Sequence, residues 1–372
     1  MFGPLRAGRL AAGRGTVGLQ LLSRLFSSLP IIDVGPLVAE NSDLAERQAV
    51  GAQLHIACRD VGFFYIKNHG IPESTYGKVL TEAQRWFNLP ENIKEQIKIT
   101  PQSHYRGYQR LGANVTRYEG GFQRDWHEGI DLYKEEDIGD VEAQGRPASP
   151  IHGRNQWPHQ LPSFEAILRT YIESMLTLSA KIARGIALGL DLKEDYFDGQ
   201  LAGDSYWVTR VIHYPPLSEG TQHRGEDGGI TAEASDAAQG AVVDRSVQLS
   251  CGEHTDYGML TMVNQTPDMT ALQVRNAQGE WVPAAPIPGT FVCNIGDMYK
   301  VWTNGLYQPT VHRVINSHPS ASRISIPFFF EPNFEATVRP LPQFCPPGEQ
   351  PKHAPVRYGT HLESKVLNNF EL

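Results

Sequence analysis

The sequence contains no run of 18 or more apolar residues, which excludes a conventional transmembrane helix. Its four cysteines are widely spaced and include no Cys-x-x-Cys pair, so we expect a reducing compartment and no disulfide framework. A stripe of lysine and arginine with interleaved aromatic residues is also lacking, and the formal net charge is −8. We therefore expect neither a nucleic-acid nor a membrane partner.

With 372 residues, of which 40% are hydrophobic and 20% charged, the chain has the composition of a soluble globular protein. It is long enough for one large domain or two ordinary ones, and it contains no internal repeats. We expect a monomer that acts on a small molecule. The predicted regions are a leader (1–28), an N-terminal α/β region (29–200), a core (201–335) and a C-terminal extension (336–372).

The first 28 residues contain no acidic residue. Their charges come from Arg6, Arg9, Arg14 and Arg24. A basic, acid-free leader is typical of a mitochondrial or plastid transit peptide, and the residues around Phe26 resemble a mitochondrial processing site. We expect a mitochondrial or plastid protein if the leader is genuine. An unstructured tail or a misassigned start codon is the alternative, and the protein would then be cytoplasmic.

Hydrophobic periodicity and turn residues predict the regular elements. Helices are expected at 43–61, 73–88, 163–190 and 358–370. Strands are expected at 30–34, 63–67, 207–214, 260–263, 272–275, 291–294, 310–314 and 323–330. Short strands with regular turns favour a double-stranded β-helix, or jelly roll. The predicted fold is therefore mainly β with flanking helices, and a long spine helix packs against a sheet.

Two segments give no clear periodicity. Residues 101–133 are rich in Tyr, Arg, Gly and Trp, and they contain a group of ligand-type residues, Asp125, His127 and Glu128, that would be a rival metal site. We discount this group because no open-faced set of partners accompanies it. Residues 217–247 are dominated by Gly, Ala, Ser, Glu and Asp, and are expected to form a disordered insertion that is either a lid or inert.

A candidate metal site lies further along the chain. Residues two apart on an extended strand point the same way, so His254 and Asp256 can offer an imidazole and a carboxylate to one point. His312 can supply a third ligand. Two histidines and one carboxylate on one face of an ion leave the opposite face open, as in non-haem Fe(II) oxygenases. Arg323 and Ser325, also two apart, can grip a carboxylate through a guanidinium fork and a hydroxyl.

From about residue 29 to residue 370, the chain resembles the iron(II)- and 2-oxoglutarate-dependent dioxygenases, in the isopenicillin N synthase-like branch with many plant hydroxylases. Several ordered motifs carry the resemblance: Leu29-Pro30-Ile31-Ile32-Asp33, Gly62-Phe63-Phe64-Tyr65-Ile66-Lys67-Asn68-His69-Gly70, Tyr214-Pro215-Pro216, His254 with Asp256, Asn294-Ile295-Gly296-Asp297-Met298, His312, and Arg323 with Ser325. The insertion at 217–247 departs from the family, in which most relatives have a short turn.

The resemblance implies that His254, Asp256 and His312 bind Fe(II). Arg323, Ser325 and Tyr214 would hold the distal carboxylate of 2-oxoglutarate, which is decarboxylated to succinate as O2 oxidises the substrate. Ascorbate is a possible reductant. Taken singly, a His-x-Asp pair is common, His312 could be a core or surface histidine, and Arg323 could pair with a surface acid. The joint pattern favours the site over these alternatives.

Substrate contacts are a further expectation. If Tyr214 faces the iron, strand alternation places Arg210 on the same inward face, and a buried arginine needs an acceptor. The resemblance places Asp131, Phe329 and Glu331 near the substrate, with Arg106 as a contact from a mobile loop. These residues predict a small polar substrate with a carboxylate or similar acceptor. The alternative is that Arg210 forms a structural ion pair with Asp131 or Glu331.

The amino-acid sequence leaves two other functions open. Some relatives keep the Arg-x-Ser pair without consuming 2-oxoglutarate, so an oxidase or cyclase is one alternative. Succinate formation would distinguish a 2-oxoglutarate-dependent dioxygenase from such an enzyme. The other is a catalytically silent binding protein on the same scaffold. The complete set of ligand-type residues weakens that alternative, and a protein that Fe(II) or Mn(II) did not stabilise would revive it.

Overall fold

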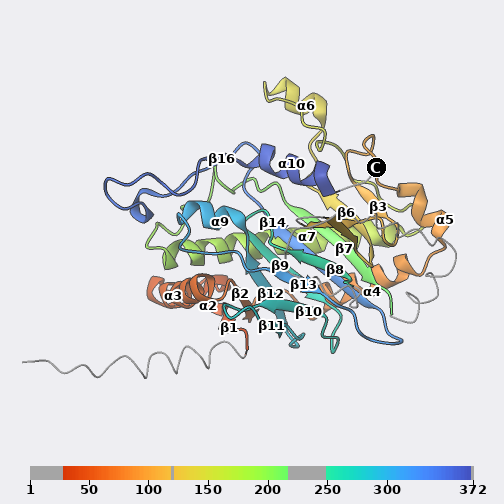
Figure 1. Cartoon of the computed structure of the whole chain (residues 1–372), viewed down its shortest axis with the longest axis horizontal. Helices are drawn as coiled ribbons and strands as arrows, with labels where there is room; N and C mark the ends of the chain where they lie inside the picture. The colour runs from red at the N-terminus through yellow and green to blue at the C-terminus, as the bar shows by residue number, and fades with distance from the viewer. Residues whose placement is uncertain (1–27, 119–120, 217–248, 370–372) are drawn as a thin grey trace, which may run out of the picture.

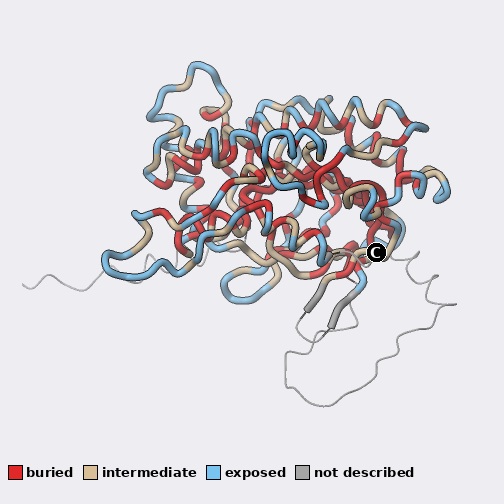
Figure 2. The backbone as a smooth tube through the Cα atoms, turned by 90° about the horizontal axis from the view of Figure 1, so that it is seen from above, coloured by how far each residue is buried: buried red, intermediate tan, exposed pale blue. Residues whose placement is uncertain are grey.

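The computed structural model describes residues 28–118, 121–216 and 249–369 (Figure 1). Residues 1–27 of the predicted leader and the whole 217–247 insertion lie outside the described residues. Buried residues concentrate in the middle of the molecule, and exposed residues lie on the outer helices and loops (Figure 2).

The main sheet contains strands from both halves of the chain. Its strand order is β1-β2-β12-β9-β14-β7-β6-β3, and only β1 and β2 pair in parallel. In that order the strands are β1 (Ile31–Asp33), β2 (Phe63–Lys67), β12 (Thr290–Ile295), β9 (Leu260–Gln265), β14 (Arg323–Phe330), β7 (Val208–Tyr214), β6 (Glu128–Tyr133) and β3 (Gly107–Gln109). The predicted N-terminal region therefore extends the core sheet at both of its edges.

A smaller sheet faces the main one. It has the order β11-β10-β13-β8, with β11 (Trp281–Pro283), β10 (Leu272–Arg275), β13 (His312–Val314) and β8 (Cys251–His254). Alternation along the strands sends one set of side chains inward. An apolar cluster that includes Phe63, Tyr65, Leu272, Val274, Val292 and Val314 joins the inner faces. The two facing sheets confirm the predicted jelly roll.

The segment 101–133 contains structure that periodicity did not reveal. It forms β3, β6 and a hairpin of β4 (Val115–Tyr118) and β5 (Gly121–Arg124). All six residues of β6 are buried, so neither face of this strand is exposed to solvent. A strand buried on both faces lacks the polar alternation that marks a half-exposed strand.

Three helices pack along the outer face of the main sheet: α3 (Leu44–Asp60), α4 (Glu73–Phe87) and α7 (Pro162–Gly189). The predicted spine is confirmed as α7. Its predicted apolar stripe is buried at every position, namely Phe164, Leu168, Tyr171, Met175, Leu178, Ile182, Ile186 and Leu190. A capping box begins α3, since Asp43 accepts from the Glu46 backbone N–H and the Glu46 carboxylate accepts from that of Asp43.

The remaining elements are short, apart from the C-terminal helix. They are α2 (Gly35–Val38), α5 (Glu91–Lys94), η1 (Glu95–Ile97), α6 (Ile138–Ala143), α9 (Asp297–Trp302), β15 (Thr337–Val338), η2 (Pro342–Phe344), β16 (Val356–Arg357) and α10 (Tyr358–Asn369). The predicted final helix is α10, which buries Tyr358, Leu362 and Val366 against the core.

Helices α3 and α7 approach so closely that glycine is required between them. A Cβ atom at Gly189 would lie 2.3 Å from the carbonyl oxygen of Gly51, and one at Gly51 would lie 2.8 Å from that of Gly185. We expect Gly189→Ala to lower the free energy of unfolding by about 1–3 kcal/mol through overpacking. Thermal unfolding measures this effect. The matched control is Gly77→Ala in α4, where a Cβ meets only a side-chain carbon at 4.0 Å and stability should hold or rise.

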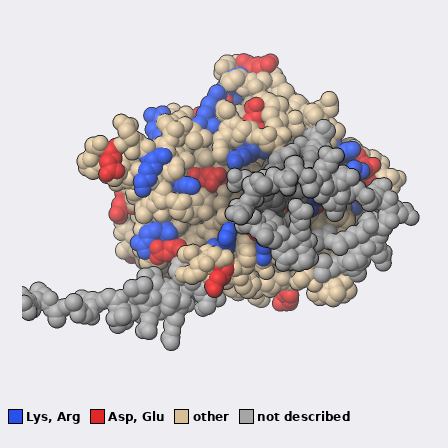
Figure 3. Space-filling model, in the orientation of Figure 1, with Lys and Arg blue, Asp and Glu red and all other residues tan. Residues whose placement is uncertain are grey.

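Among the helices of the described residues, none is both long and apolar enough to cross a lipid bilayer. On the face seen in Figure 3, basic and acidic side chains are interspersed outside the grey atoms. This distribution offers no broad basic surface on that face for a nucleic-acid backbone.

Candidate active site

The three predicted metal ligands meet where the smaller sheet approaches the main one. His312 begins β13 and lies opposite His254, the last residue of β8. Asp256 follows in the loop after β8, so the course of this loop, and not the predicted strand alternation, brings it beside His254. One ligand atom from each residue lies within 4.8 Å of the others, and both imidazole Nε2 atoms are 3.7 Å from Asp256 Oδ1.

Backbone carbonyls fix the orientation of both imidazoles. The Nδ1 of His254 lies 2.8 Å from the Gly252 carbonyl oxygen, and that of His312 lies 3.1 Å from the Thr310 carbonyl oxygen. Since a carbonyl only accepts, each Nδ1 carries a proton and each Nε2 is directed toward Asp256, where its lone pair would be available to a metal ion. A carbonyl that holds the far side of a histidine is the usual support of a metal ligand. Burial lowers the pKa of His312 to about 4; burial also opposes a charge on His254, but Cys251 and Asp256 raise the pKa of His254 to about 10.

Asp256 is held in its ionised form. Burial opposes its charge, but electrostatic attraction to His312 and His254 and hydrogen bonds from Asn294 and Thr261 to Oδ2 lower its pKa overall. These two bonds leave Oδ1 to face the histidines. The side chain of His254 is 33% exposed, whereas those of Asp256 and His312 are 6% and 9% exposed. The donor set therefore suits a divalent metal ion, and two of its three side chains are shielded from solvent.

The predicted 2-oxoglutarate anchor lies on the inner faces of β14 and β7. Arg323 is directly opposite Tyr214, and the hydroxyl of Ser325 lies 3.5 Å from that of Tyr214. Arg323 Nη2 donates to Gln265 Oε1 at 2.7 Å, a partner that sequence reasoning missed. Arg323 is 1% exposed, yet its Nε and Nη1 have no hydrogen-bond partner among the described residues. Burial lowers the pKa of Arg323, so an anionic ligand that supplied acceptors would stabilise its charge.

The predicted Arg210–Asp131 ion pair is present, at 2.8 Å between Nε and Oδ1. The other carboxylate oxygen, Oδ2, accepts from Gln109 Nε2 at 2.7 Å. Both carboxylate oxygens of Asp131 thus have partners within the protein. Arg210 Nη2 and Gln109 Oε1, although buried, have none in the described part of the chain. Sequence reasoning missed Gln109 because it lies in the segment without periodicity.

The three residues of the rival group, Asp125, His127 and Glu128, do not converge on one point in the structure. Asp125 accepts from Asn114, Thr116 and the Gly252 backbone, so it is a structural acceptor. Glu128 contacts Lys94, Tyr108 and His213, on the face of β6 opposite to that of Asp131. Within the described residues, the only three-residue group that could hold a metal is His254, Asp256 and His312. His127 is different, because its ring lies 5.6 Å from that of Tyr214 and borders the anchor.

The other three substrate candidates lie in different surroundings. Arg106 is fully buried and donates to the carbonyls of Ile151 and Lys134, contacts that give it a structural role and not that of a mobile arm. Glu331 packs against Gly258, where a Cβ atom would overlap its carboxylate, and burial raises its pKa to about 8. It does not pair with Arg210. Phe329 is half-buried on the inward-facing side of β14.

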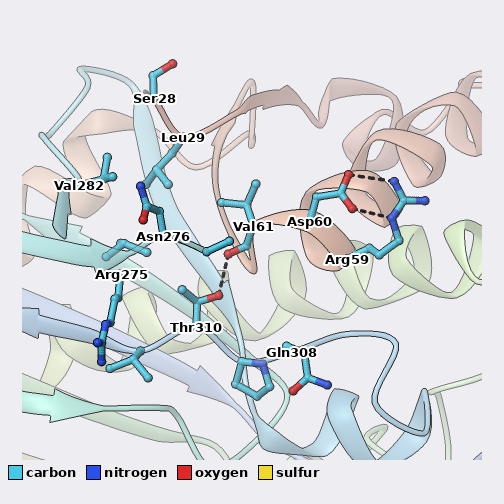
Figure 4. Close-up of a pocket in the computed structure, with 14 residues that line it drawn as sticks. Ser28, Leu29, Arg59, Asp60, Val61, Arg275, Asn276, Val282, Gln308 and Thr310 are labelled. Carbon is cyan, nitrogen blue, oxygen red and sulfur yellow. Dashed lines mark hydrogen bonds and ion pairs between the residues drawn. The ribbon is translucent and has the colours of Figure 1, made fainter. Parts of the chain in front are cut away.

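A separate pocket of about 300 Å³ lies near the start of the described chain (Figure 4). Leu29, Val61 and Val282 contribute apolar surface, and the Thr310 hydroxyl donates to the Val61 carbonyl. Three charged residues line it: Arg59 and Asp60 bind each other, and Arg275 lies over the Trp281 ring. None of the metal or anchor residues lines this pocket, so we assign it no chemistry.

Comparisons with known proteins agree with this geometry. Residues 29–160 match the family described as non-haem dioxygenase in morphine synthesis N-terminal, and residues 209–332 match the 2OG-Fe(II) oxygenase superfamily. A rice homoarginine-6-hydroxylase is 45% identical over 93% of this chain and 98% of its own. An Arabidopsis thaliana homoarginine-6-hydroxylase is 44% identical over 93% and 99%. A 1-aminocyclopropane-1-carboxylate oxidase of Dictyostelium discoideum is 31% identical over 86% of each chain.

Solved structures support the fold. A full-length Neurospora crassa protein, in complex with alpha-KG and thymine, matches with a TM-score of 0.73 at 23% identity, over 93% of this chain and 98% of its own. JOX2, in complex with 2OG, Fe and JA, gives 0.67 at 24% identity, over 93% and 90%. Because its relatives match over nearly its whole length and the structure brings together a His-Asp-His facial triad, the chain belongs to the 2OG-Fe(II) oxygenase superfamily and is an enzyme dependent on Fe(II) and 2-oxoglutarate.

Proposed function

We propose that the enzyme hydroxylates a cationic α-amino acid of the homoarginine type, with conversion of 2-oxoglutarate to succinate. The similarity to homoarginine-6-hydroxylases carries this proposal, because the two quoted relatives cover nearly the whole of both chains. Homoarginine is small and polar and carries a carboxylate, which agrees with the substrate class expected from the sequence.

The polar lining of the site supports the same substrate class. Gln109, His127 and Asp131 are 2%, 1% and 3% exposed, and they lie on the side of the main sheet that carries Arg210 and Tyr214. Buried polar groups are costly unless they are hydrogen-bonded, so such a lining favours a ligand with several donors and acceptors. A flat aromatic substrate would leave these atoms without partners.

The roles of the protein's own residues follow from the geometry. His254, Asp256 and His312 would hold Fe(II), which when bound supplies the activation of O2. Arg323, Ser325 and Tyr214 would orient the distal carboxylate of 2-oxoglutarate. The buried walls would exclude water from the reacting groups and so limit unproductive oxidation.

Oxidation of 1-aminocyclopropane-1-carboxylate is the alternative, suggested by the name of the Dictyostelium relative. That relative is less similar than the homoarginine-6-hydroxylases. Arg323 Nε and Nη1, which no described residue pairs, also favour a dicarboxylate co-substrate, because a carboxylate provides acceptors for both.

A substrate panel tests the proposal. The purified enzyme with Fe(II), 2-oxoglutarate and O2 would be offered homoarginine, arginine, lysine and a neutral amino acid, while succinate and product mass are measured. We expect homoarginine to give succinate and a product heavier by one oxygen atom in about equal amounts, as a coupled reaction requires. If only the neutral amino acid stimulated succinate release, the result would contradict the proposal.

We also propose that residues 1–28 direct import into mitochondria, on the basis of their four arginines and lack of acidic residues. A reporter fused to residues 1–28 should reach mitochondria, and a control in which Arg6, Arg9, Arg14 and Arg24 are replaced by glutamine should remain in the cytosol. A reporter with the native leader that stayed cytosolic would refute the proposal.

A further inference from the structure

Three buried hydrogen-bonding atoms that have no partner among the described residues lie on or beside β7, β6 and β3, on the side of the main sheet that carries the predicted 2-oxoglutarate anchor. They are Arg210 Nη2 on β7, Gln109 Oε1 on β3 and His127 Nε2 just before β6. Cross-strand pairing places Arg210 opposite Asp131, and Gln109 opposite Gly129. Asp131 joins the first two, since it accepts from Arg210 Nε and Gln109 Nε2.

Whether each of these atoms donates or accepts a hydrogen bond follows from the bond that another atom of the same side-chain group makes. Asp131 accepts only, so Gln109 must direct its amide nitrogen there and leave Oε1 as an acceptor. His127 Nδ1 lies 2.6 Å from the Ser250 carbonyl oxygen and therefore carries the proton. Burial lowers the pKa of His127, so its ring stays neutral and Nε2 is a second acceptor. Arg210 Nη2 is a cationic donor.

One donor and two acceptors match the α-amino-acid head group. A carboxylate can accept from Arg210 Nη2, while an ammonium group can donate to Gln109 Oε1 and His127 Nε2. The Arg210–Asp131 pair is neutral overall, as is the zwitterion. A guanidinium group offers donors only, so in this place it would leave Arg210 Nη2 without an acceptor and put two cations together. A simple carboxylic acid would leave both acceptors without donors.

We infer that Arg210, Gln109 and His127 form the receptor for the α-carboxylate and α-ammonium groups of the substrate, an inference that rests on the proposed amino-acid hydroxylase function. The receptor adjoins the anchor, because Tyr214 lies 5.6 Å from the His127 ring and 5.0 Å from the Arg323 guanidinium. With the head group held here, the side chain is the part of the substrate left to approach the metal. Oxidation then falls on a side-chain carbon and not on the α-carbon.

The test combines substrate analogues with variants. Homoarginine would be compared with its decarboxylated amine and with its deaminated acid, by kcat/KM from succinate and hydroxylated product. For Arg210→Met we expect kcat/KM with homoarginine to fall about 10- to 100-fold, as when a charge-assisted hydrogen bond is lost. With the wild-type enzyme, kcat/KM for the decarboxylated amine should be lower than that for homoarginine by the same factor. With Arg210→Met, kcat/KM for the decarboxylated amine should fall little further.

A second variant addresses the ammonium group. His127→Phe keeps a ring against Tyr214 but removes Nε2. It should therefore lower kcat/KM with homoarginine and change kcat/KM with the deaminated acid little. Titration with Fe(II) and 2-oxoglutarate checks that both variants remain folded. The control is Arg184→Met, which removes an ion pair with Asp198 on the surface and should behave as the wild type.

The outcomes separate the two proposals. If the wild-type enzyme does not hydroxylate homoarginine or another amino acid, the proposed function fails. If it does, but each variant loses the same factor on homoarginine and on the matching analogue, the head group does not bind these atoms and the receptor is overturned. Losses that are specific to the matching group support it.

Discussion

Asp256→Ala is expected to abolish turnover and to weaken Fe(II) binding by more than about 100-fold. Asp256 supplies the only negative charge among the three ligands, and loss of even a supporting residue behind a ligand costs about 10- to 100-fold in metal affinity. Its removal also leaves the amide of Asn294 and the hydroxyl of Thr261 without their shared acceptor. The measurements are iron content after dialysis and succinate release.

The control for this substitution is Asp140→Ala, which removes an exposed carboxylate on α6. It should retain normal iron content and activity. An Asp256→Ala protein with the iron content and turnover of the wild type would show that the metal lies elsewhere.

Arg323→Lys is expected to raise the 2-oxoglutarate concentration needed for half-maximal turnover about 10- to 100-fold. Lysine keeps the positive charge but loses the planar fork, and a charge-assisted hydrogen bond contributes about 1.5–3 kcal/mol. Iron binding should change little, because Arg323 contacts Gln265 and Tyr214 and none of the three ligands. An unchanged 2-oxoglutarate dependence would make Arg323 a structural residue.

Much of the fold was predictable where the sequence carries period and turn signals. Strands β2, β10 and β14 were predicted with the bounds that the structure gives, and α7 within one residue at each end. The strand β6 was missed, because burial on both faces removes the alternation that marks a strand. Without β6, the position of Asp131 opposite Arg210 could not be derived from the sequence.

Sequence motifs single out the metal-ligating residues and Arg323 of the candidate site, whereas the neutral residues beside them carry no such signal, and Arg106 was wrongly expected to be a mobile substrate contact. Gln265 and Gln109 are common polar residues that acquire their roles only through strand register, which places them beside Arg323 and Asp131. His127 was set aside as part of a rival cluster, although its neighbours Asp125 and Glu128 point elsewhere in the fold. For Arg210, one guanidinium nitrogen forms the ion pair while another has no acceptor among the described residues.

The most direct test of the central claim is an anaerobic titration of the purified protein with Fe(II) and then 2-oxoglutarate, followed by visible absorption. If His254, Asp256 and His312 hold the metal beside Arg323, the charge-transfer band of Fe(II)-bound 2-oxoglutarate should appear at one equivalent. It should be absent in Asp256→Ala and should require more 2-oxoglutarate in Arg323→Lys. A band of unchanged intensity and midpoint in both variants would contradict the assigned site.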